Sequence, residues 1–122
     1  GSANAFVDSV VIAAYTQCDQ WLDELNEYIK GNLEYFAKEI NSIAPLKMHV
    51  PEGTYLAWVD CRGLKMTDEE LTAFFKEKCH LAFNGGTFFG PEGSGFVRAN
   101  MACPRSYVEE AVKRIKAGVA SL

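Results

Sequence analysis

The sequence predicts an α+β fold in which helices pack against one small, mostly antiparallel sheet of three to four strands. Apolar residues recur at helical spacing in four segments, and shorter apolar segments between them have the length and bounding turns of strands. The chain has 122 residues, of which 48% are hydrophobic. This is enough for one domain with a packed core but not for two.

Two helices open the chain. Asn4 can cap a first helix from Ala5 to about Thr16. A longer helix is expected from Gln20 to about Ser42, because its apolar side chains form a sustained one-sided stripe. We expect this stripe to pack in the core, and its members are Trp21, Leu22, Leu25, Tyr28, Ile29, Leu33, Phe36, Ile40 and Ile43.

Two strands follow the Ala44-Pro45 step, which ends the second helix. Leu46 to Val50 is predicted to form the first strand and Pro51 to Gly53 a turn. The second strand, Thr54 to Asp60, is largely apolar on both faces. A strand of this kind needs cover on both sides.

The next segment combines a short helix, a short strand and a loop. Thr67 and Glu70 form a capping box, which opens a helix that ends near Lys78. A very short strand is expected from Leu81 to Phe83. Several glycines and a proline then predict an irregular loop from Asn84 to Ser94, and long loops in small domains are often functional.

The last strand, Phe96 to Ala102, precedes a final helix from Pro104 to about Ala120. Side chains alternate across a strand, so one face carries small or apolar residues suited to lie under helices, namely Val97, Ala99 and Met101. Arg98 and Asn100 are then expected on the opposite face.

Arg98 is the unexpected residue of this strand. Its planar guanidinium can offer two parallel donors to a carboxylate and stays charged at any relevant pH, which favours an anion site. Asn100 beside it can donate and accept hydrogen bonds. A solvated arginine or a local ion pair is the alternative. The neighbouring glycine-rich loop lacks the lysine and hydroxyl of a phosphate-binding P-loop.

Composition excludes several classes of protein. The net charge of −4, without a basic cluster, disfavours nucleic-acid binding. No apolar run is long enough to span a membrane and no signal segment opens the chain, so we expect a cytoplasmic protein. Four cysteines without metal-ligand spacing are expected to be free, buried thiols rather than two disulfides, and adjacent Cys79 and His80 are not expected to be catalytic.

Three segments resemble the C-terminal part of class I/II aminotransferases: PEGTYLAWVD, NGGTFFG, and GFVRANMACPR followed by a helix. These are fold-type I enzymes that use pyridoxal 5'-phosphate, and the resemblance extends to their cystathionine β-lyase-like (carbon–sulfur lyase) branch. The stretch AFVDSVVIAAYTQCDQWLDELNEYIKGN is similar to the helices that lead into the small domain. The resemblance implies a helical lead-in over residues 3–44 and an α+β small domain over 45–122 in one structural unit. Gly1-Ser2 is typical of a cloning remnant, so residues 1–2 are left out of the domain.

The resemblance also implies a role for three residues. Arg98 would bind the α-carboxylate of an amino-acid substrate, with Asn100 and Asn84 as supporting residues, and residues 84–90 would line the substrate entrance. The parent enzyme would be a homodimeric aminotransferase or β-lyase that uses pyridoxal 5'-phosphate. The lysine that forms the Schiff base and the aspartate that pairs with the pyridine nitrogen have no counterpart in the sequence. We therefore expect the chain alone to bind no cofactor and to be inactive.

A second hypothesis is a stand-alone α+β module that binds an anionic metabolite or a partner protein. The strand Thr54 to Asp60 separates the two hypotheses. A complete module should cover both of its apolar faces with its own helices, whereas part of a larger enzyme should leave an apolar patch.

Overall fold

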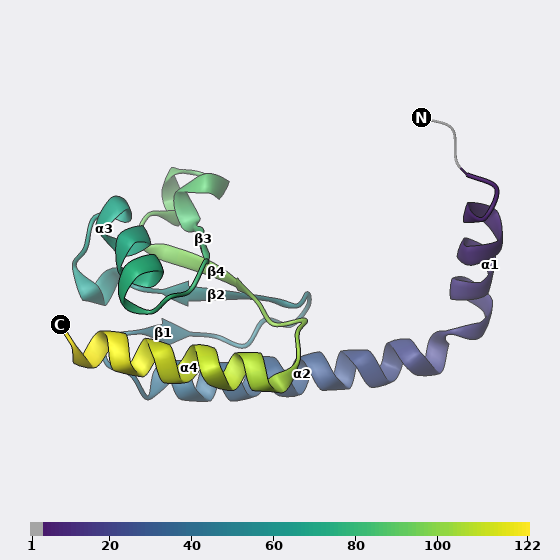
Figure 1. Ribbon diagram of the computed structural model, residues 1–122, viewed down its shortest axis with the longest axis horizontal. Coiled ribbons are helices and arrows are strands. Elements are labelled where there is room, and N and C mark those ends of the chain that lie inside the picture. Colours follow the sequence, from purple (N-terminus) through teal and green to yellow (C-terminus); the bar gives the residue numbers. More distant parts are fainter. Residues whose placement is uncertain (1–3) are drawn as a thin grey trace.

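In the computed structural model, which describes residues 4–122, a small sheet lies on a layer formed by two long helices (Figure 1). The proposed cloning remnant, residues 1–2, lies outside the described residues. The helices are α1 (Val7–Gln17), α2 (Asp19–Asn41), α3 (Asp68–Ala73) and α4 (Arg105–Ala120). The strands are β1 (Lys47–Met48), β2 (Leu56–Asp60), β3 (Asn84–Gly85) and β4 (Phe96–Asn100).

All strand pairs of the sheet are antiparallel. The order across its four strands is β1-β2-β4-β3, so β4 is paired on both sides. In the register of β2 with β4, Ala57 is opposite Ala99 and Trp58 is opposite Arg98. The predicted α+β fold is confirmed.

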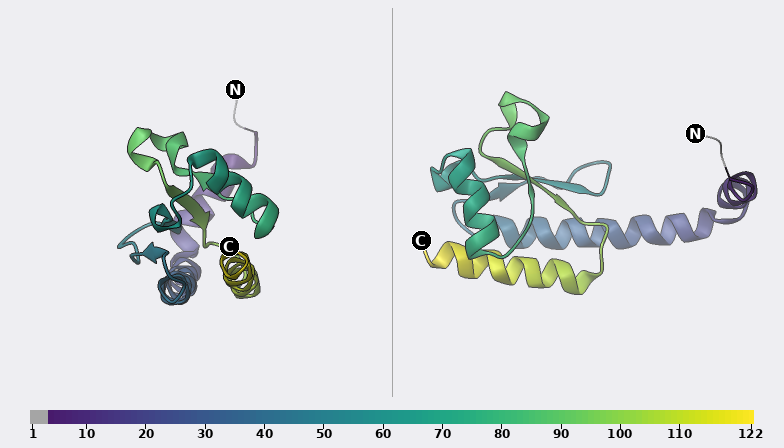
Figure 2. Two further views of the ribbon diagram at one scale, coloured as in Figure 1. Left: turned by 90° about the vertical axis from the view of Figure 1, so that its left-hand side faces the viewer. Right: turned by 45° about the horizontal axis from the view of Figure 1, so that its top comes forward.

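The core lies between one face of the sheet and the helices α2 and α4 (Figure 2). On β4, Val97 and Ala99 point into this core, followed by Met101 just beyond the strand, as the alternation predicts. The helix residues that complete this core are fully or almost fully buried: Leu33, Phe36 and Ile40 of α2, and Val108, Val112 and Ile115 of α4. Glu39 and Lys116 form an ion pair that joins the outer sides of these two helices.

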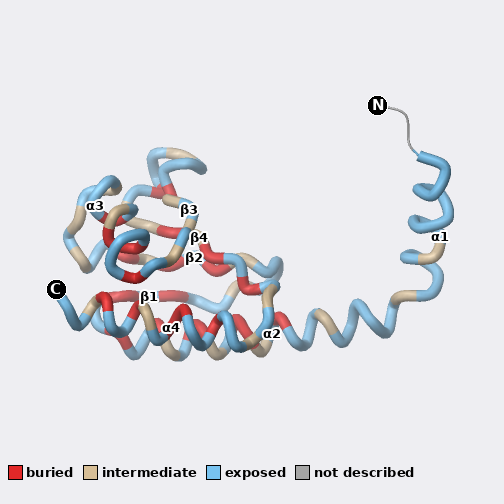
Figure 3. The backbone as a smooth tube through the Cα atoms, in the orientation of Figure 1, coloured by how far each residue is buried: buried red, intermediate tan, exposed pale blue. Residues whose placement is uncertain are grey.

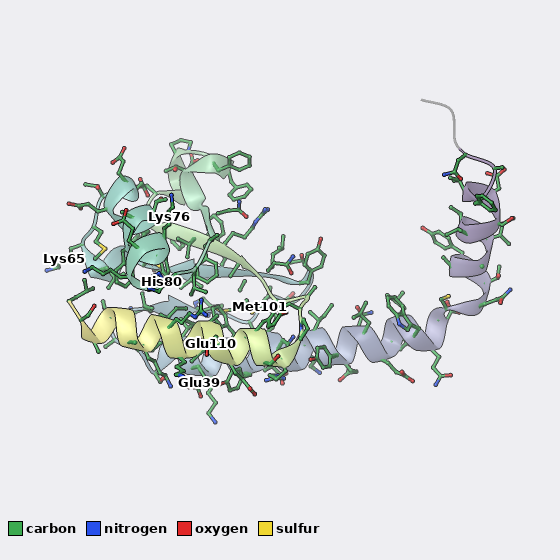
Figure 4. All side chains as sticks on the ribbon, viewed as in Figure 1. Glu39, Lys65, Lys76, His80, Met101 and Glu110 are labelled. Carbon is green, nitrogen blue, oxygen red and sulfur yellow. The ribbon has the colours of Figure 1, made fainter. Side chains whose placement is uncertain are left out.

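The helix α1 and the N-terminal end of α2 lie away from this core. Most of their residues are exposed (Figure 3), and their side chains project from the ribbon (Figure 4). Phe6, just before α1, is 77% exposed and Trp21 is 63% exposed. Our expectation that the whole apolar stripe of α2 packs in the core is therefore wrong for Trp21, Leu22 and Tyr28. Periodicity identifies an apolar helix face, but not the surface that covers it.

The segment between α3 and β4 also differs from the prediction. The helix continues from α3 into a π-helical turn, Phe74–Lys78, and His80 then adopts a positive φ of 53°. The next residue bonds back to this turn, because the Leu81 N–H donates to the Phe75 carbonyl. No strand forms over residues 81–83; the strand begins at Asn84, and two 3-10 turns, Gly86–Phe89 and Pro91–Gly93, replace the irregular loop.

One buried amide fixes the end of β4 to α2. Asn32 is fully buried, and its Nδ2 donates to the carbonyl oxygens of Met101 (3.0 Å; labelled in Figure 4) and Cys103 (2.8 Å). One turn earlier on α2, the hydroxyl of Tyr28 accepts a hydrogen bond from the backbone N–H of Arg105. The path from β4 into α4 is therefore held by side chains of α2.

We predict that Asn32→Ala lowers the free energy of unfolding by about 2–3 kcal/mol, because it leaves one buried and one partly buried carbonyl group without their donor. Urea denaturation measures the change. Asn26→Ala, at an exposed position of the same helix, is the control and should change stability by less than about 0.5 kcal/mol. Equal effects of the two substitutions would show that the buried amide is not an anchor.

The cysteines are free thiols, as predicted. Cys61 and Cys79 are buried as expected, but Cys18 and Cys103 are partly accessible, so the expectation that all four thiols are buried is wrong for these two. Burial raises the pKa of Cys61 to about 12 and that of Cys79 to about 11. Within residues 4–122 no cluster of histidine, cysteine or acidic side chains is suited to bind a metal ion, and none of the helices could serve as a transmembrane segment.

Thiol labelling should follow this division, because the thiolate is the reactive form. At pH 8 a disulfide reagent should modify Cys18 and Cys103 in the folded chain, and Cys61 and Cys79 only after denaturation.

The raised pKa values of Cys61 and Cys79 also predict that the free energy of unfolding falls as the pH rises from about 9 to about 12, since the unfolded state releases these protons first. Cys61→Ala should reduce this loss, and rapid labelling of all thiols in the native chain would refute the assignment.

Candidate functional site

The face of the sheet opposite the helices carries a group of exposed or partly exposed aromatic side chains, which we call the aromatic patch. Its members are Trp58 on β2, Phe88 and Phe89 in the first 3-10 turn, and Phe96 on β4. Trp58 stacks on Phe96 with ring centroids 5.5 Å apart and meets Phe89 edge-on at 5.9 Å. Trp58 remains 38% exposed. The second apolar face of β2 is thus not covered by a helix among the described residues.

Arg98 lies at the centre of this face. The sheet places it between Trp58 on β2 and Asn84 on β3, in one row across three strands. Its Nη2 donates to Oδ1 of Asn84 at 3.2 Å, and its Cζ lies 4.3 Å from the centroid of the Phe89 ring. The side chain is half-buried, and within residues 4–122 its other N–H groups form no hydrogen bond.

Arg98 differs from Arg62, the other arginine of this face, in its charge balance. Arg62 lies over Phe96 at 4.8 Å, but it also forms a two-point interaction with Asp60 through Nε (3.0 Å) and Nη2 (2.8 Å). This interaction lowers the pKa of the Asp60 carboxyl. Within residues 4–122 the ion pairs of the structure do not include Arg98, so its positive charge has no carboxylate partner there.

The two asparagines that the sequence placed near Arg98 have different contacts. Asn84 binds the guanidinium directly. Asn100 lies on the same face, but its Oδ1 accepts a hydrogen bond from the backbone N–H of Ala102 at 2.8 Å. Asn100 therefore stabilises the turn after β4, and the structure does not bring its side chain into a hydrogen bond with Arg98.

The loop that carries Phe89 is held at both ends. Gly86 and Gly93 approach so closely that a Cβ atom on either would lie 2.0–2.1 Å from the carbonyl oxygen of the other. At the far end, Asp68 of α3 accepts hydrogen bonds from the Ser94 hydroxyl (2.7 Å) and the Gly95 N–H (2.9 Å). These two bonds lower the pKa of Asp68. The first 3-10 turn is therefore an ordered part of the site.

Sequence reasoning did not link two residues of this site to Arg98. Trp58 was given no role, and Phe89 was included only within residues 84–90, which were expected to line the substrate entrance. Trp58 was assigned to a face of its strand, but its position opposite Arg98 depends on the pairing register, which the sequence did not provide. Phe89 was assigned to an irregular loop. The sequence signal for Phe89 was a pair of phenylalanines directly before Gly90. In the structure Gly90 has a φ of 140°, which favours glycine and marks a fixed turn.

Two curated bacterial proteins are similar to the chain. Protein MalY of Escherichia coli strain K12 is 45% identical over 102 residues, which cover 83% of this chain and 26% of that protein. Cystathionine beta-lyase PatB of Bacillus subtilis strain 168 is 34% identical over 120 residues, which cover 98% of this chain and 31% of that protein. The chain thus spans about a quarter to a third of the length of these relatives.

Solved structures show the same fold. Cystalysin from Treponema denticola, which contains a pyridoxal 5'-phosphate cofactor, matches 88% of this chain and 28% of its own with a TM-score of 0.85 and 33% identity. A pyridoxal phosphate-bound C-S lyase from Staphylococcus hominis, complexed with L-cycloserine, matches 98% of this chain and 30% of its own with a TM-score of 0.86 and 30% identity.

A family profile gives the widest assignment. The profile described as "Aminotransferase class I and II" matches residues 3–115, which include the sheet, the aromatic patch and Arg98. The sequence resemblance, the solved structures and this match agree. The chain therefore belongs to the class I and II aminotransferase family.

Proposed function

We propose that this chain forms the C-terminal domain of a pyridoxal phosphate-dependent aminotransferase or carbon–sulfur β-lyase, and that Arg98 binds the α-carboxylate of its amino-acid substrate. One observation carries the second part of the proposal. Arg98 is held in place by a neutral amide and an aromatic ring, and within residues 4–122 no carboxylate neutralises it. A guanidinium in this state is prepared to bind an external anion.

A carboxylate bound at Arg98 would be gripped through parallel N–H donors, which fix its plane as well as its position. This orients the rest of the substrate and restricts rotation about the bonds of its α-carbon, so that less entropy is lost when the reacting groups meet. Asn84 contributes by holding Nη2 of Arg98. Binding of the α-carboxylate serves transamination and β-elimination equally.

Pyridoxal 5'-phosphate, when bound, acts as an electron sink for the bond broken at the α-carbon. The described residues do not fit a holder for this cofactor. No lysine among residues 4–122 is hydrogen-bonded or ion-paired at the group formed by Arg98, Asn84 and Phe89, and no phosphate-binding loop precedes a helix there. The cofactor site would come from the remainder of the longer enzyme, and the homodimer of that enzyme stays a prediction.

The exposed apolar surfaces support a place within a larger protein over a stand-alone module. The aromatic patch is open on one face of the sheet, and α1 contributes further exposed side chains such as Val10 (64%) and Tyr15 (83%). Exposed apolar surfaces of this kind usually mark contacts with another part of a protein. The reading frame upstream of residue 3 tests this directly, and the absence of a lysine-bearing domain there would refute the proposal.

The role of Arg98 can be tested in the full-length enzyme with two ligands that differ in one group, L-alanine and L-alaninamide. We predict that Arg98→Lys weakens binding of L-alanine by about 10- to 100-fold, because the two-point grip on the carboxylate is lost. Binding of L-alaninamide should change by less than about threefold. The change in cofactor absorbance on titration measures both affinities, and the absorbance of the free enzyme should remain that of the wild type.

Arg105→Lys is the matched control for this test. Arg105 also lies over an aromatic ring, that of Tyr35 at 5.0 Å, but on the helical layer and not on the open face of the sheet. Its replacement should leave the affinity for L-alanine unchanged. Wild-type affinity for L-alanine in Arg98→Lys would remove Arg98 from the substrate site.

The chain alone should not form a specific complex with pyridoxal 5'-phosphate, because it has no residues that fit the cofactor. We predict that an absorbance titration of the 122-residue chain gives a weak change that does not saturate, from reaction with surface lysines. Prior acetylation of the lysines should abolish the change. A saturable complex with one cofactor per chain would contradict the assignment of the cofactor site to the remainder of the enzyme.

A further inference from the structure

Phe89 lies directly beneath the guanidinium of Arg98, at 4.3 Å from ring centroid to Cζ. We propose that Phe89 is a positioning residue, which fixes the plane of the Arg98 guanidinium so that its free N–H groups face the substrate carboxylate. The proposal rests on the function proposed above for Arg98. It assigns a role to a loop residue that has no polar group and cannot itself bind the ligand.

Two conditions have to be met at this site: the side chain of Arg98 must be held in place, and its N–H groups must stay free for the substrate carboxylate. Cζ of Arg98 lies over the face of the Phe89 ring, and this cation–π contact restrains the side chain. The ring is uncharged, so it does not neutralise the guanidinium as a carboxylate would. Asn84 completes the restraint with one bond to Nη2, and the other N–H groups stay free.

Phe89 is itself fixed. Its ring meets Trp58 at 5.9 Å and Phe88 at 5.0 Å, both in edge-on geometry. Its backbone belongs to the 3-10 turn that the close contact of Gly86 with Gly93 holds shut. The ring is 46% exposed, which is high for a phenylalanine that only fills space, but suits a residue that flanks an open binding site.

The same face of the sheet provides a comparison. Phe96 lies beneath Arg62 at 4.8 Å, but Asp60 already occupies the donors of that guanidinium. The ring there cannot prepare a site for an external anion, because the arginine is neutralised. The Phe96 and Arg62 pair is therefore a structural comparison for the Phe89 and Arg98 pair.

The test uses the full-length enzyme with L-alanine and L-alaninamide as ligands, and cofactor absorbance as the signal. We expect Phe89→Leu to weaken binding of L-alanine by about three- to tenfold and that of L-alaninamide by less than about twofold. Phe89→Tyr keeps the ring and should bind both ligands as the wild type does. Tyr35→Leu, which removes the ring beneath Arg105 on the helical layer, is the control and should also bind both ligands as the wild type does.

A double-mutant cycle decides whether Phe89 acts through Arg98. With Arg98→Gln, which removes the cation, Phe89→Leu should weaken L-alanine binding by less than about twofold more. A full effect in this background would overturn the proposal, because Phe89 would then act independently of the guanidinium. Equal weakening of L-alanine and L-alaninamide by Phe89→Leu would also overturn it, in favour of a general structural role.

The proposal and the proposed function fail in different ways. If Arg98→Lys weakens L-alanine binding but Phe89→Leu does not, the positioning role is wrong and the carboxylate site stands. If Arg98→Lys binds L-alanine as the wild type does, both are wrong. Phe89→Met provides a second variant without a ring should Phe89→Leu fail to fold, and the same loss of L-alanine affinity is expected from it.

Discussion

Burial of one face of β4 against α2 and α4 is the constraint on which the rest of the structure depends. Val97 and Ala99 are almost completely buried there, and a strand alternates its side chains, so Arg98 between them has to point to the opposite face. A slip of one residue would place a charged guanidinium in the core, at a cost far above that of any surface interaction. The hydrophobic core therefore determines where the cation lies.

Electrostatics then distinguish two arginines that lie on the same face. Arg62 lies beside a carboxylate that it neutralises, whereas Arg98 lies beside the uncharged side chains of Asn84 and Phe89. An ion pair at a surface contributes little to stability, so the absence of one at Arg98 costs the fold little. The absence of an ion pair leaves the positive charge of Arg98 available to bind an anion.

The sequence predicted the structural features that depend on residues close together along the chain. The capping box of Thr67 and Glu70 is present as expected, and the alternation of β4 placed Arg98 on the correct face. The predictions that failed depend on distant contacts. Trp21 lies on an apolar helix stripe but has no cover here, and residues 81–83 do not form a strand because Leu81 bonds back to the π-helical turn. Phe89 reaches Arg98 only because the loop folds over the sheet.

The contact of Gly86 with Gly93 limits how this loop can change during evolution or design. Any side chain at either position would overlap the other backbone, so the two glycines cannot be replaced one at a time without opening the turn. Variation is free only at solvent-facing positions such as Thr87 and Glu92. A surface loop, where insertions and substitutions are ordinarily tolerated, is here as restricted in sequence as the interior of the domain.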